Sequence, residues 1–328
     1  MNKNFFKNKV LLITGGTGSF GKAFVNYLLK NKIPLKKIII FSRDELKQFE
    51  MSKIYNENKY PCMRYLIGDV RDKERVKMAF RDVDIVVHAA ALKQVPAAEY
   101  NPIEYIKTNI IGAQNIIESS LDTNIQKVIA LSTDKASSPI NLYGATKLCS
   151  DKLFVSANNI KGSKNLMFSV VRYGNVMGSR GSVLHNFIEQ KYNKFLEVTD
   201  IKMTRFNITI NEAINFVIER LFSMKGGEIF VPKIPSFRII DLAKAVSEKC
   251  KIIITGIRPG EKLHEEMIST FDSLNTVDLG NYYAILTSRL SNKYYQNFLK
   301  KEFSYRSDTN FHFLKTEDLR KIIKNFIS

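Results

Sequence analysis

A glycine-rich turn between an apolar strand and an amphipathic helix constrains the fold of this chain more than any other feature. Residues 9–14 are predicted to form the strand, and residues 22–29 the helix. The turn between them carries Gly15, Gly18 and Gly21 with the spacing G-x-x-G-x-x-G. Gly15 permits a tight turn, Gly18 lets a pyrophosphate approach the backbone, and Gly21 allows close packing of helix on strand. The helix N-terminus then faces the phosphates, so the segment predicts a dinucleotide site rather than a glycine loop without function.

Short apolar strands alternate with helical segments through the first half of the chain. Further strands are predicted at residues 37–41, 65–70, 83–91, 128–131 and 168–173. This alternation predicts an α/β fold, a Rossmann-type doubly wound parallel sheet. Ligands of such sheets bind beyond the carboxyl ends of the strands, so functional side chains are expected at that edge.

The alternation stops near residue 175. Runs at residues 226–235 and 252–262 have the character of short strands that end in loops, and residues 315–326 are predicted to form a helix. We therefore predict a cofactor-binding first domain over residues 1–175 and a smaller, mainly substrate-binding C-terminal lobe over residues 176–328. Whether some segments of the second half return to the first domain stays open.

The segment after the first strand–turn–helix unit bears on the choice of cofactor. An acidic residue at the tip of the second strand would bind a ribose 2′-hydroxyl and indicate NAD. Here the tip carries Ser42 and Arg43, with Lys47 one helical turn later. This arrangement suits a 2′-phosphate and favours NADP, although Asp44 leaves NAD open. Asp44 can also serve the positive end of a helix dipole.

Small or polar residues follow the next strands. Asp69 and Val70 are expected to face the adenine, and residues 89–91, all alanine, let a flat ligand lie against the backbone. His88 is interpreted as a packed, hydrogen-bonded residue at a strand end rather than a base. Residues 92–102 are expected to form a loop, and residues 103–120 a helix.

A tyrosine and a lysine lie four residues apart after the fifth strand, at the start of a helical pattern. Tyr143 and Lys147 therefore share a helix face. A nearby ammonium favours the phenolate, so we expect a lowered tyrosine pKa and a general base for a sugar hydroxyl. Such a pair alone is weak evidence. Its value comes from its position at the same sheet edge as the glycine turn.

Composition excludes several classes of protein. The formal charge is +18, but the basic residues are spread along the chain without interleaved aromatics, so nucleic acid is not expected as a partner. No apolar run reaches the length of about 20 residues that a membrane span needs. The basic N-terminus lacks the features of a signal peptide. Three scattered cysteines and four histidines without ligand spacing predict reduced thiols, a cytoplasmic location and no metal.

The motifs together resemble those of a known family. Thr14, the glycines of the turn, Asn109, Thr133 and the Tyr143/Lys147 pair resemble the extended short-chain dehydrogenase/reductases that act on nucleotide sugars. Closer similarity to the inverting UDP-N-acetylglucosamine 4,6-dehydratases is seen at residues 42–48, 131–136, 141–147, 171–176 and 257–264. The resemblance implies the first step of pseudaminic acid biosynthesis, a pathway that supplies flagellin glycosylation.

Two features are typical of this subfamily, and three depart from it. Lys135 follows Asp134 where related sugar dehydratases have Glu, and Tyr143 lies only ten positions after Thr133. Membrane-anchored relatives often carry Met in place of this tyrosine. The departures are Gln94 in place of His, Asn207 in place of Trp, and Leu184-His185-Asn186 in place of Val-Pro-Phe. They bear on substrate detail more than on reaction type.

The resemblance implies a role for each residue of the strand-five segment. Tyr143, held as phenolate by Lys147, takes the proton of the sugar 4-hydroxyl while NADP⁺ takes the C4 hydride. Lys135 then acts as base at C5, for which its pKa has to fall, and Asp134 protonates the departing 6-hydroxyl. Hydride returns to C6 and a proton is added to C5 from the opposite face, with Tyr143 as its candidate donor. Thr133 hydrogen-bonds the 4-hydroxyl or Tyr143.

Three sets of site residues follow. The catalytic set is Thr133, Asp134, Lys135, Tyr143 and Lys147. The cofactor set, for an NADP that stays bound and is regenerated each turnover, is Gly15, Thr17, Gly18, Ser19, Phe20, Gly21, Ser42, Arg43, Asp44, Lys47, Asp69, Val70, Ala89, Ala90, Ala91, Lys93, Asn109, Tyr143 and Lys147. The substrate set, for UDP-GlcNAc, is Lys93, Tyr143, Asn175, Arg180, Arg205, Arg258 and Glu261. Lys107 and Asn109 are expected to orient Lys147 through water.

Alternative functions remain at this stage. A UDP-sugar 4-epimerase needs only Thr133, Tyr143 and Lys147, and has no use for an acid and a base at C5 and C6. A non-catalytic NADP-binding module on the same fold can dispense with Tyr143 and Lys147. The family resemblance implies a homo-oligomer, either a dimer or a hexamer, that is not associated with membranes.

Overall fold

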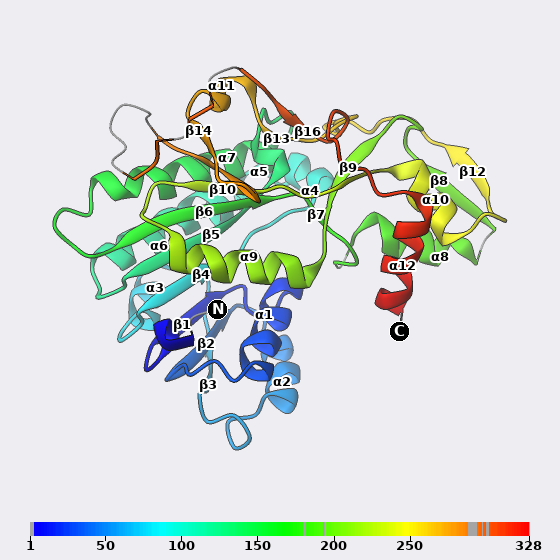
Figure 1. Cartoon of the computed structure of the whole chain (residues 1–328). Helices are drawn as coiled ribbons and strands as arrows, with labels where there is room; N and C mark the ends of the chain where they lie inside the picture. Colours follow the sequence, from blue (N-terminus) through cyan, green and yellow to red (C-terminus); the bar gives the residue numbers. More distant parts are fainter. Residues whose placement is uncertain are drawn as a thin grey trace.

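A nine-stranded sheet forms the centre of the chain in the computed structural model, which describes residues 3–179, 181–192, 194–287, 294–296, 298–299 and 302–327. Its strand order is β14-β15-β10-β6-β5-β4-β1-β2-β3 (Figure 1). The strands are β1 (Val10–Thr14), β2 (Lys37–Ser42), β3 (Met63–Ile67), β4 (Ile85–His88), β5 (Lys127–Thr133), β6 (Met167–Tyr173), β10 (Ile229–Pro232), β14 (Thr276–Asp278) and β15 (Tyr282–Ile285). The seven strands from β3 to β10 pair in parallel, and β15 and β14 add in antiparallel fashion. The predicted α/β fold with a parallel sheet is confirmed.

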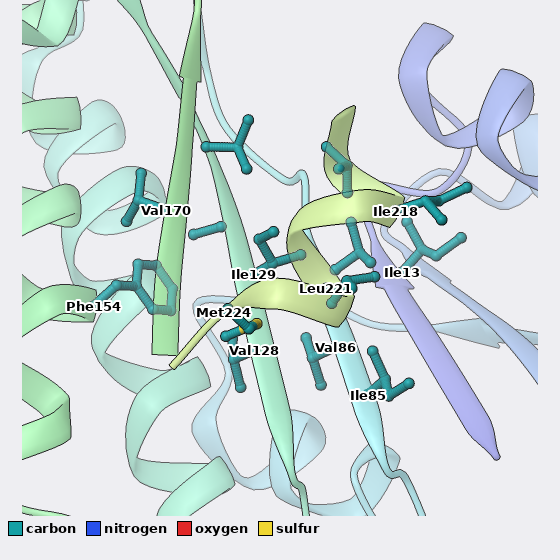
Figure 2. Packing of buried hydrophobic residues seen from close by; sticks show 14 of the residues in the cluster. Ile13, Ile85, Val86, Val128, Ile129, Phe154, Val170, Ile218, Leu221 and Met224 are labelled. Atoms are coloured by element: carbon teal, nitrogen blue, oxygen red, sulfur yellow. The ribbon is translucent and has the colours of Figure 1, made fainter. Parts of the chain in front are cut away.

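Helices cover both faces of this sheet. α1 (Ser19–Lys30) contacts α9 (Ile210–Ser223), whereas α6 (Gly112–Leu121) contacts α3 (Lys73–Ala79) and α7 (Leu142–Ser156). Figure 1 shows α9 lying across one face, with α3, α6 and α7 behind the sheet. In Figure 2, Ile218 and Leu221 of α9 face Ile13, Val86 and Val128 of the strands. These central strands are buried on both faces, so they are almost continuously apolar.

The segment after β4 corrects the loop predicted at residues 92–102. It contains helix α4 (Val95–Tyr100), and Pro96 lies in its first turn, where proline is tolerated because the missing N–H has no helical partner. The helix predicted at residues 103–120 consists of α5 (Pro102–Tyr105), a π-helical turn η2 (Ile106–Ile111) and α6.

The second half of the chain contributes to two units. α9, β10, β14 and β15 belong to the large sheet or cover it, whereas a smaller unit has its own core. This unit contains the pair β8 (Phe195–Val198) and β12 (Lys251–Ile254), and a three-stranded sheet of β7 (Asn175–Val176), β9 (Thr204–Ile208) and β11 (Ser236–Arg238). Its helices are α8 (Val183–Lys191), α10 (Ile239–Val246) and α12 (Thr316–Ile327). A further antiparallel pair consists of β13 (Glu266–Ile268) and β16 (Tyr305–Arg306).

The remaining short elements are α2 (Glu45–Ile54), α11 (Thr270–Ser273), η1 (Lys3–Phe6), η3 (Asp134–Ala136) and η4 (Ala157–Asn159). Across the described ranges, every helix is too short or too polar to cross a lipid bilayer.

A buried ion pair joins the strands that carry the site to the helix beside them. Arg172 of β6 and Asp151 of α7 are each 1% exposed, and Nη2 lies 3.1 Å from Oδ2. The Asp151 carboxylate also accepts a hydrogen bond of 2.7 Å from the hydroxyl of Ser132 in β5. Arg172 Nη1 donates to the carbonyl of Met267 in β13 at 3.0 Å. The pair thus fixes β5, β6, α7 and β13 relative to one another.

Replacing Asp151 by Ala should lower the free energy of unfolding by about 3–5 kcal/mol. The Arg172 guanidinium would stay buried, and the carboxylate left to it, that of Asp272, is 3.9 Å away. Urea denaturation of the purified protein measures the change. The matched control is Asp122→Ala, which removes the same group from a surface ion pair with Lys77 and should change stability little. Equal losses in the two variants would contradict the structural role of the buried pair.

Candidate active site

A cleft of about 790 Å³ opens at the carboxyl ends of the parallel strands. Its walls come from the glycine turn, the ends of β2, β4, β5 and β6, the start of α7, and the segment around β7. All residues of the predicted cofactor set except Asn109 line this cleft. Of the predicted catalytic residues, Thr133, Lys135, Tyr143 and Lys147 line it as well. Their roles in binding and catalysis remain predictions.

The glycine turn has the geometry that a bound diphosphate requires. Gly15 has a φ of +64°, and a Cβ atom there would lie 2.9 Å from the Cα of Ala90. At Gly21 a Cβ would lie 2.3 Å from the carbonyl oxygen of Gly16, which explains the close approach of α1. The N-cap residue Gly18 offers α1 no side-chain cap. The first N–H groups and the positive end of the helix dipole therefore face the cleft, where phosphate oxygens fit.

The end of β2 places basic groups around the expected ribose site. Asp44 caps α2: its carboxylate accepts from the Lys47 N–H at 3.0 Å and forms an ion pair with the Lys47 ammonium. These contacts with Lys47 hold the pKa of Asp44 below its ordinary value. The Arg43 guanidinium is half-exposed and lies 3.6 Å from the carboxylate of Asp69. Asp44 thus serves its own helix, and Arg43 lines the cleft beside Asp69.

His88 lies below the turn and is packed, as predicted. It is 1% exposed, and its Nδ1 lies 2.8 Å from the hydroxyl of Thr14. The same hydroxyl accepts a hydrogen bond of 3.2 Å from the Ala90 N–H. Burial, with a smaller contribution from the charge of Lys147, lowers the pKa of His88 to about 3. The neutral imidazole therefore supports the strand end rather than transferring protons.

Asn109 and Lys107, which were expected to orient Lys147 through water, make their direct contacts with other residues. Asn109 is buried in η2, where it holds the backbone of Leu92 through two hydrogen bonds of 2.9 and 3.0 Å and donates to the Thr146 hydroxyl at 3.0 Å. It thus positions the loop whose neighbouring residues line the cleft. Lys107 is exposed and pairs with Glu104 at 3.6 Å, because it lies on the outer face of the same turn.

Tyr143 and Lys147 lie on the buried face of α7, but the expected lowering of the tyrosine pKa is wrong for this structure. Burial raises the pKa of Tyr143 to about 12, against smaller opposing effects of the Lys135 charge and a hydrogen bond with Thr133. Lys147 donates to the carbonyl of Leu131 at 2.8 Å, and burial lowers its own pKa. Desolvation of the phenolate, which the i, i+4 spacing does not reveal, outweighs the nearby cations.

Lys135 lies between two carboxylates. Its Nζ is 3.2 Å from Asp134 Oδ1 and 2.9 Å from Glu265 Oε1, and both carboxylate side chains are nearly fully buried. Burial alone would lower the pKa of Lys135, but the two carboxylates outweigh burial and raise it. The expected lowering of this pKa is therefore wrong. Burial raises the pKa of Asp134, which suits the predicted acid.

Glu265 is a buried residue in contact with Lys135 that the sequence analysis did not include among the candidate site residues. It follows the motif at residues 257–264 directly, but its contact with Lys135 spans 130 positions of the chain. Burial alone would raise the pKa of Glu265, but the charges of Lys135 and Arg205 outweigh burial and lower this pKa. The only signal in the sequence was its position after that motif.

The structure separates the predicted substrate residues. Asn175 lines the cleft, and its buried Oδ1 has no hydrogen-bond partner among the described residues. Arg205 is buried and pairs with Glu261 at 3.2 Å and with Glu265 at 3.6 Å, so it supports the site from behind. Arg258 is exposed, and Arg180 lies outside the described residues. Lys93 lines the cleft, and burial lowers its pKa.

The three departures from the family pattern lie near this region. Gln94 lines the cleft, and Asn207 is buried in β9 directly opposite Asn175. His185 lies in α8, with its Nδ1 3.2 Å from the Ser182 hydroxyl. The three cysteines are free thiols, and His, Cys, Asp and Glu form no metal-binding group within the described part of the chain.

Comparisons with known proteins agree with this geometry. Residues 11–287 match the family described as "Polysaccharide biosynthesis protein". A UDP-N-acetylglucosamine 4,6-dehydratase (inverting) from Campylobacter jejuni subsp. jejuni strain 81-176 is 54% identical, with 98% of each chain covered. A UDP-glucose 4-epimerase from Rickettsia bellii is 42% identical, with 97% of this chain and 95% of the relative covered. The X-ray structure of Pen from Bacillus thuringiensis superposes with a TM-score of 0.89 at 40% identity, covering 98% of this chain and 99% of that one.

Protonation of His88 should destabilise the fold in acid. Its pKa of about 3 lies below the value of about 6.5 expected in the unfolded chain, so the unfolded state binds more protons below pH 6.5. The folded state then loses stability at up to about 1.4 kcal/mol per pH unit as the pH falls from about 6.5 toward 3. In a His88→Gln variant this part of the loss should disappear. Urea denaturation at several pH values compares the two slopes, and identical slopes would contradict a neutral, buried His88.

Proposed function

The chain belongs to the polysaccharide biosynthesis protein family, and on that basis we propose that it is a C5-inverting UDP-N-acetylglucosamine 4,6-dehydratase. The product is UDP-2-acetamido-2,6-dideoxy-β-L-arabino-hex-4-ulose. The observation that carries the proposal is the buried Asp134 beside Lys135 at the end of β5, next to Tyr143. An acid and an amine at this point serve the loss of water from C5 and C6.

A 4-epimerase is the second candidate, because a relative with that name is 42% identical. Epimerisation at C4 requires proton transfer at the 4-hydroxyl only. Epimerisation gives no role to Asp134, a buried acid whose pKa is raised. The dehydratase relative is also more similar to this chain, at 54% identity. Dehydration is therefore the better-supported function.

The cofactor we propose is NADP. Bound in the cleft, it would accept a hydride from C4 and return it to C6, so the net reaction is a dehydration. The uncapped N-terminus of α1 fits the diphosphate, and Arg43 and Lys47 surround the position expected for the 2′-phosphate. Arg43 is not occupied by Asp44, whose carboxylate is engaged by its own helix.

Tyr143 begins the proposed reaction by taking the proton of the 4-hydroxyl. Although burial holds its pKa high, the charge of Lys135 and the hydrogen bond with Thr133 act in the direction of the phenolate. Lys147 is held by the Leu131 carbonyl one helical turn from Tyr143.

Lys135 and Asp134 act at C5 and C6. Once C4 is a ketone, the proton on C5 is acidic. The two carboxylates keep Lys135 as an ammonium, so it removes the C5 proton only after it has lost one of its own. Its ammonium proton has an acceptor at 2.9 Å, the carboxylate of Glu265. Asp134 does not line the cleft, so its proton reaches the departing 6-hydroxyl through the hydroxyl of Thr133, which lines the cleft and lies 3.0 Å from Asp134 Oδ1. The later addition of a proton to the opposite face of C5, for which Tyr143 is the proposed donor, inverts that centre.

The remaining assignments are also proposals. Asn175 offers a buried amide oxygen to the UDP-sugar, and Lys93 offers a cation at the cleft wall. Arg258 and Arg180 are retained as candidates for the diphosphate. We place the reaction in the cytoplasm at the start of pseudaminic acid biosynthesis, with a homo-oligomeric enzyme.

The proposal predicts a defined labelling pattern in D₂O. The wild-type protein, incubated with UDP-GlcNAc, should give a product with a 6-methyl signal and deuterium at C5 in the NMR spectrum. Simple inversion at C4 without a new methyl group would instead identify an epimerase.

The Lys135→Ala variant should lose deuterium incorporation at C5, because the group that removes this proton is gone. A loss of activity of roughly 10²–10⁴-fold is typical when a general base is removed. Dinucleotide binding, measured by fluorescence titration, should survive. Undiminished exchange at C5 would show that another residue is the base.

Arg43→Ala should weaken NADP binding about tenfold or more, since a charge-assisted hydrogen bond to the 2′-phosphate is worth about 1.5–3 kcal/mol. NAD binding should stay unchanged because NAD lacks this phosphate. The control is Lys53→Ala, which removes a cation of α2 that does not line the cleft. An equal loss for both cofactors would argue against recognition of the 2′-phosphate by Arg43.

A further inference from the structure

A chain of ion pairs extends behind the cleft from the large sheet to β9 of the smaller unit. It runs from Asp134 to Lys135, from Lys135 to Glu265, and from Glu265 to Arg205, with nitrogen–oxygen distances of 3.2, 2.9 and 3.6 Å. Asp134 and Glu265 do not line the cleft, whereas Lys135 does. Any effect of Glu265 on the sugar therefore passes through Lys135.

The carboxylates of Asp134 and Glu265 both contact the Lys135 ammonium, but their contacts with cations differ. Glu265 has the shorter contact with Lys135 and a second cation, Arg205, within 3.6 Å. Among the described residues, Asp134 forms an ion pair with Lys135 alone, at 3.2 Å. Two buried carboxylates that share the Lys135 ammonium disfavour double ionisation, so the carboxylate without a further cation is the one that retains a proton. The geometry gives the negative charge to Glu265.

The surroundings of Asp134 agree with a neutral carboxyl group. Its Oδ2 is buried without a hydrogen-bond partner among the described residues and lies against Gly174, which lines the cleft. The other ionisable groups that face it are Tyr143 and Lys262. Lys262 donates to a backbone carbonyl at 2.7 Å, and burial lowers its pKa. The pKa of Asp134 is raised by burial, whereas that of Glu265 is lowered by its two cations.

We propose that Glu265 is a positioning residue that neutralises the Lys135 ammonium and thereby leaves a proton on Asp134 for the departing hydroxyl. This inference rests on the proposed dehydration. Without Glu265, Asp134 would become the counter-ion of Lys135 and would lose its proton. The sugar contacts of the cleft would stay in place, because Glu265 does not line it.

Infrared spectroscopy of the protein at neutral pH tests the protonation directly, without turnover. Exposed aspartates are ionised at this pH, so the C=O stretch of a protonated carboxyl reports a buried one. The wild type should show this band, it should shift when aspartate carries a ¹³C-labelled side-chain carboxyl, and it should be absent in Asp134→Asn. Glu265→Gln should lose the band as well, whereas Glu265→Asp should keep it. A wild type without the Asp134-dependent band, or a Glu265→Gln variant that retains it, overturns the proposal.

The neighbouring glutamate provides a matched control. Glu266 is the first residue of β13 and accepts a hydrogen bond of 2.7 Å from the Ser138 hydroxyl. Glu266→Gln should retain both the band and the activity. In Glu265→Gln, kcat should fall roughly 10²-fold with KM unchanged, and Glu265→Asp should restore much of it. A rise in KM with unchanged kcat would contradict the positioning role.

The proposed function and the role of Glu265 can be refuted separately. A wild type that forms no 6-methyl product from UDP-GlcNAc refutes the proposed function, whatever the infrared result. A wild type that forms this product but lacks the Asp134 band refutes only the role of Glu265.

Discussion

Parallel pairing of β1, β4, β5 and β6 is the constraint on which the rest of the structure depends. Parallel strands end at one edge of the sheet, so the glycine turn after β1, the alanines after β4 and the Thr133–Lys135 segment after β5 meet there. The buried Arg172–Asp151 pair then fixes α7 against β6, which places Tyr143 and Lys147 at the same edge. The residues of the proposed dinucleotide site and of the proposed proton transfers thus line one cleft.

The second half of the chain completes this edge from outside the sheet. Glu265 and Arg205 come from the loop before β13 and from β9, and their charges reach Lys135 from behind the cleft. A dehydrogenase-type site needs only a tyrosine, a lysine and a dinucleotide. In the proposed reaction, the carboxylates around Lys135 extend that chemistry to the removal of water, because Glu265 serves as counter-ion and Asp134 as acid.

Sequence patterns predicted the parts of this arrangement that depend on local geometry. The glycine spacing located the turn, apolar runs located the strands, and the rule for parallel sheets located the cleft. The pKa values of Tyr143 and Lys135 were predicted wrongly, because burial and a partner 130 positions away decide them. Residues 95–100 were taken for a loop, because a proline in the first helical turn looks like a helix breaker. The sequence also did not show in which direction the side chains of η2 point. Lys107 was therefore expected near Lys147, although it is exposed and pairs with Glu104.

The central claim is that hydride leaves C4 and returns to C6 of the same sugar, with water lost in between. UDP-GlcNAc labelled with deuterium at C4 tests this most directly, by NMR of the product formed by the wild-type protein in ordinary water. The account predicts that the deuterium appears in the 6-methyl group. Deuterium that remains at C4, with inversion of that centre and no methyl signal, would contradict it.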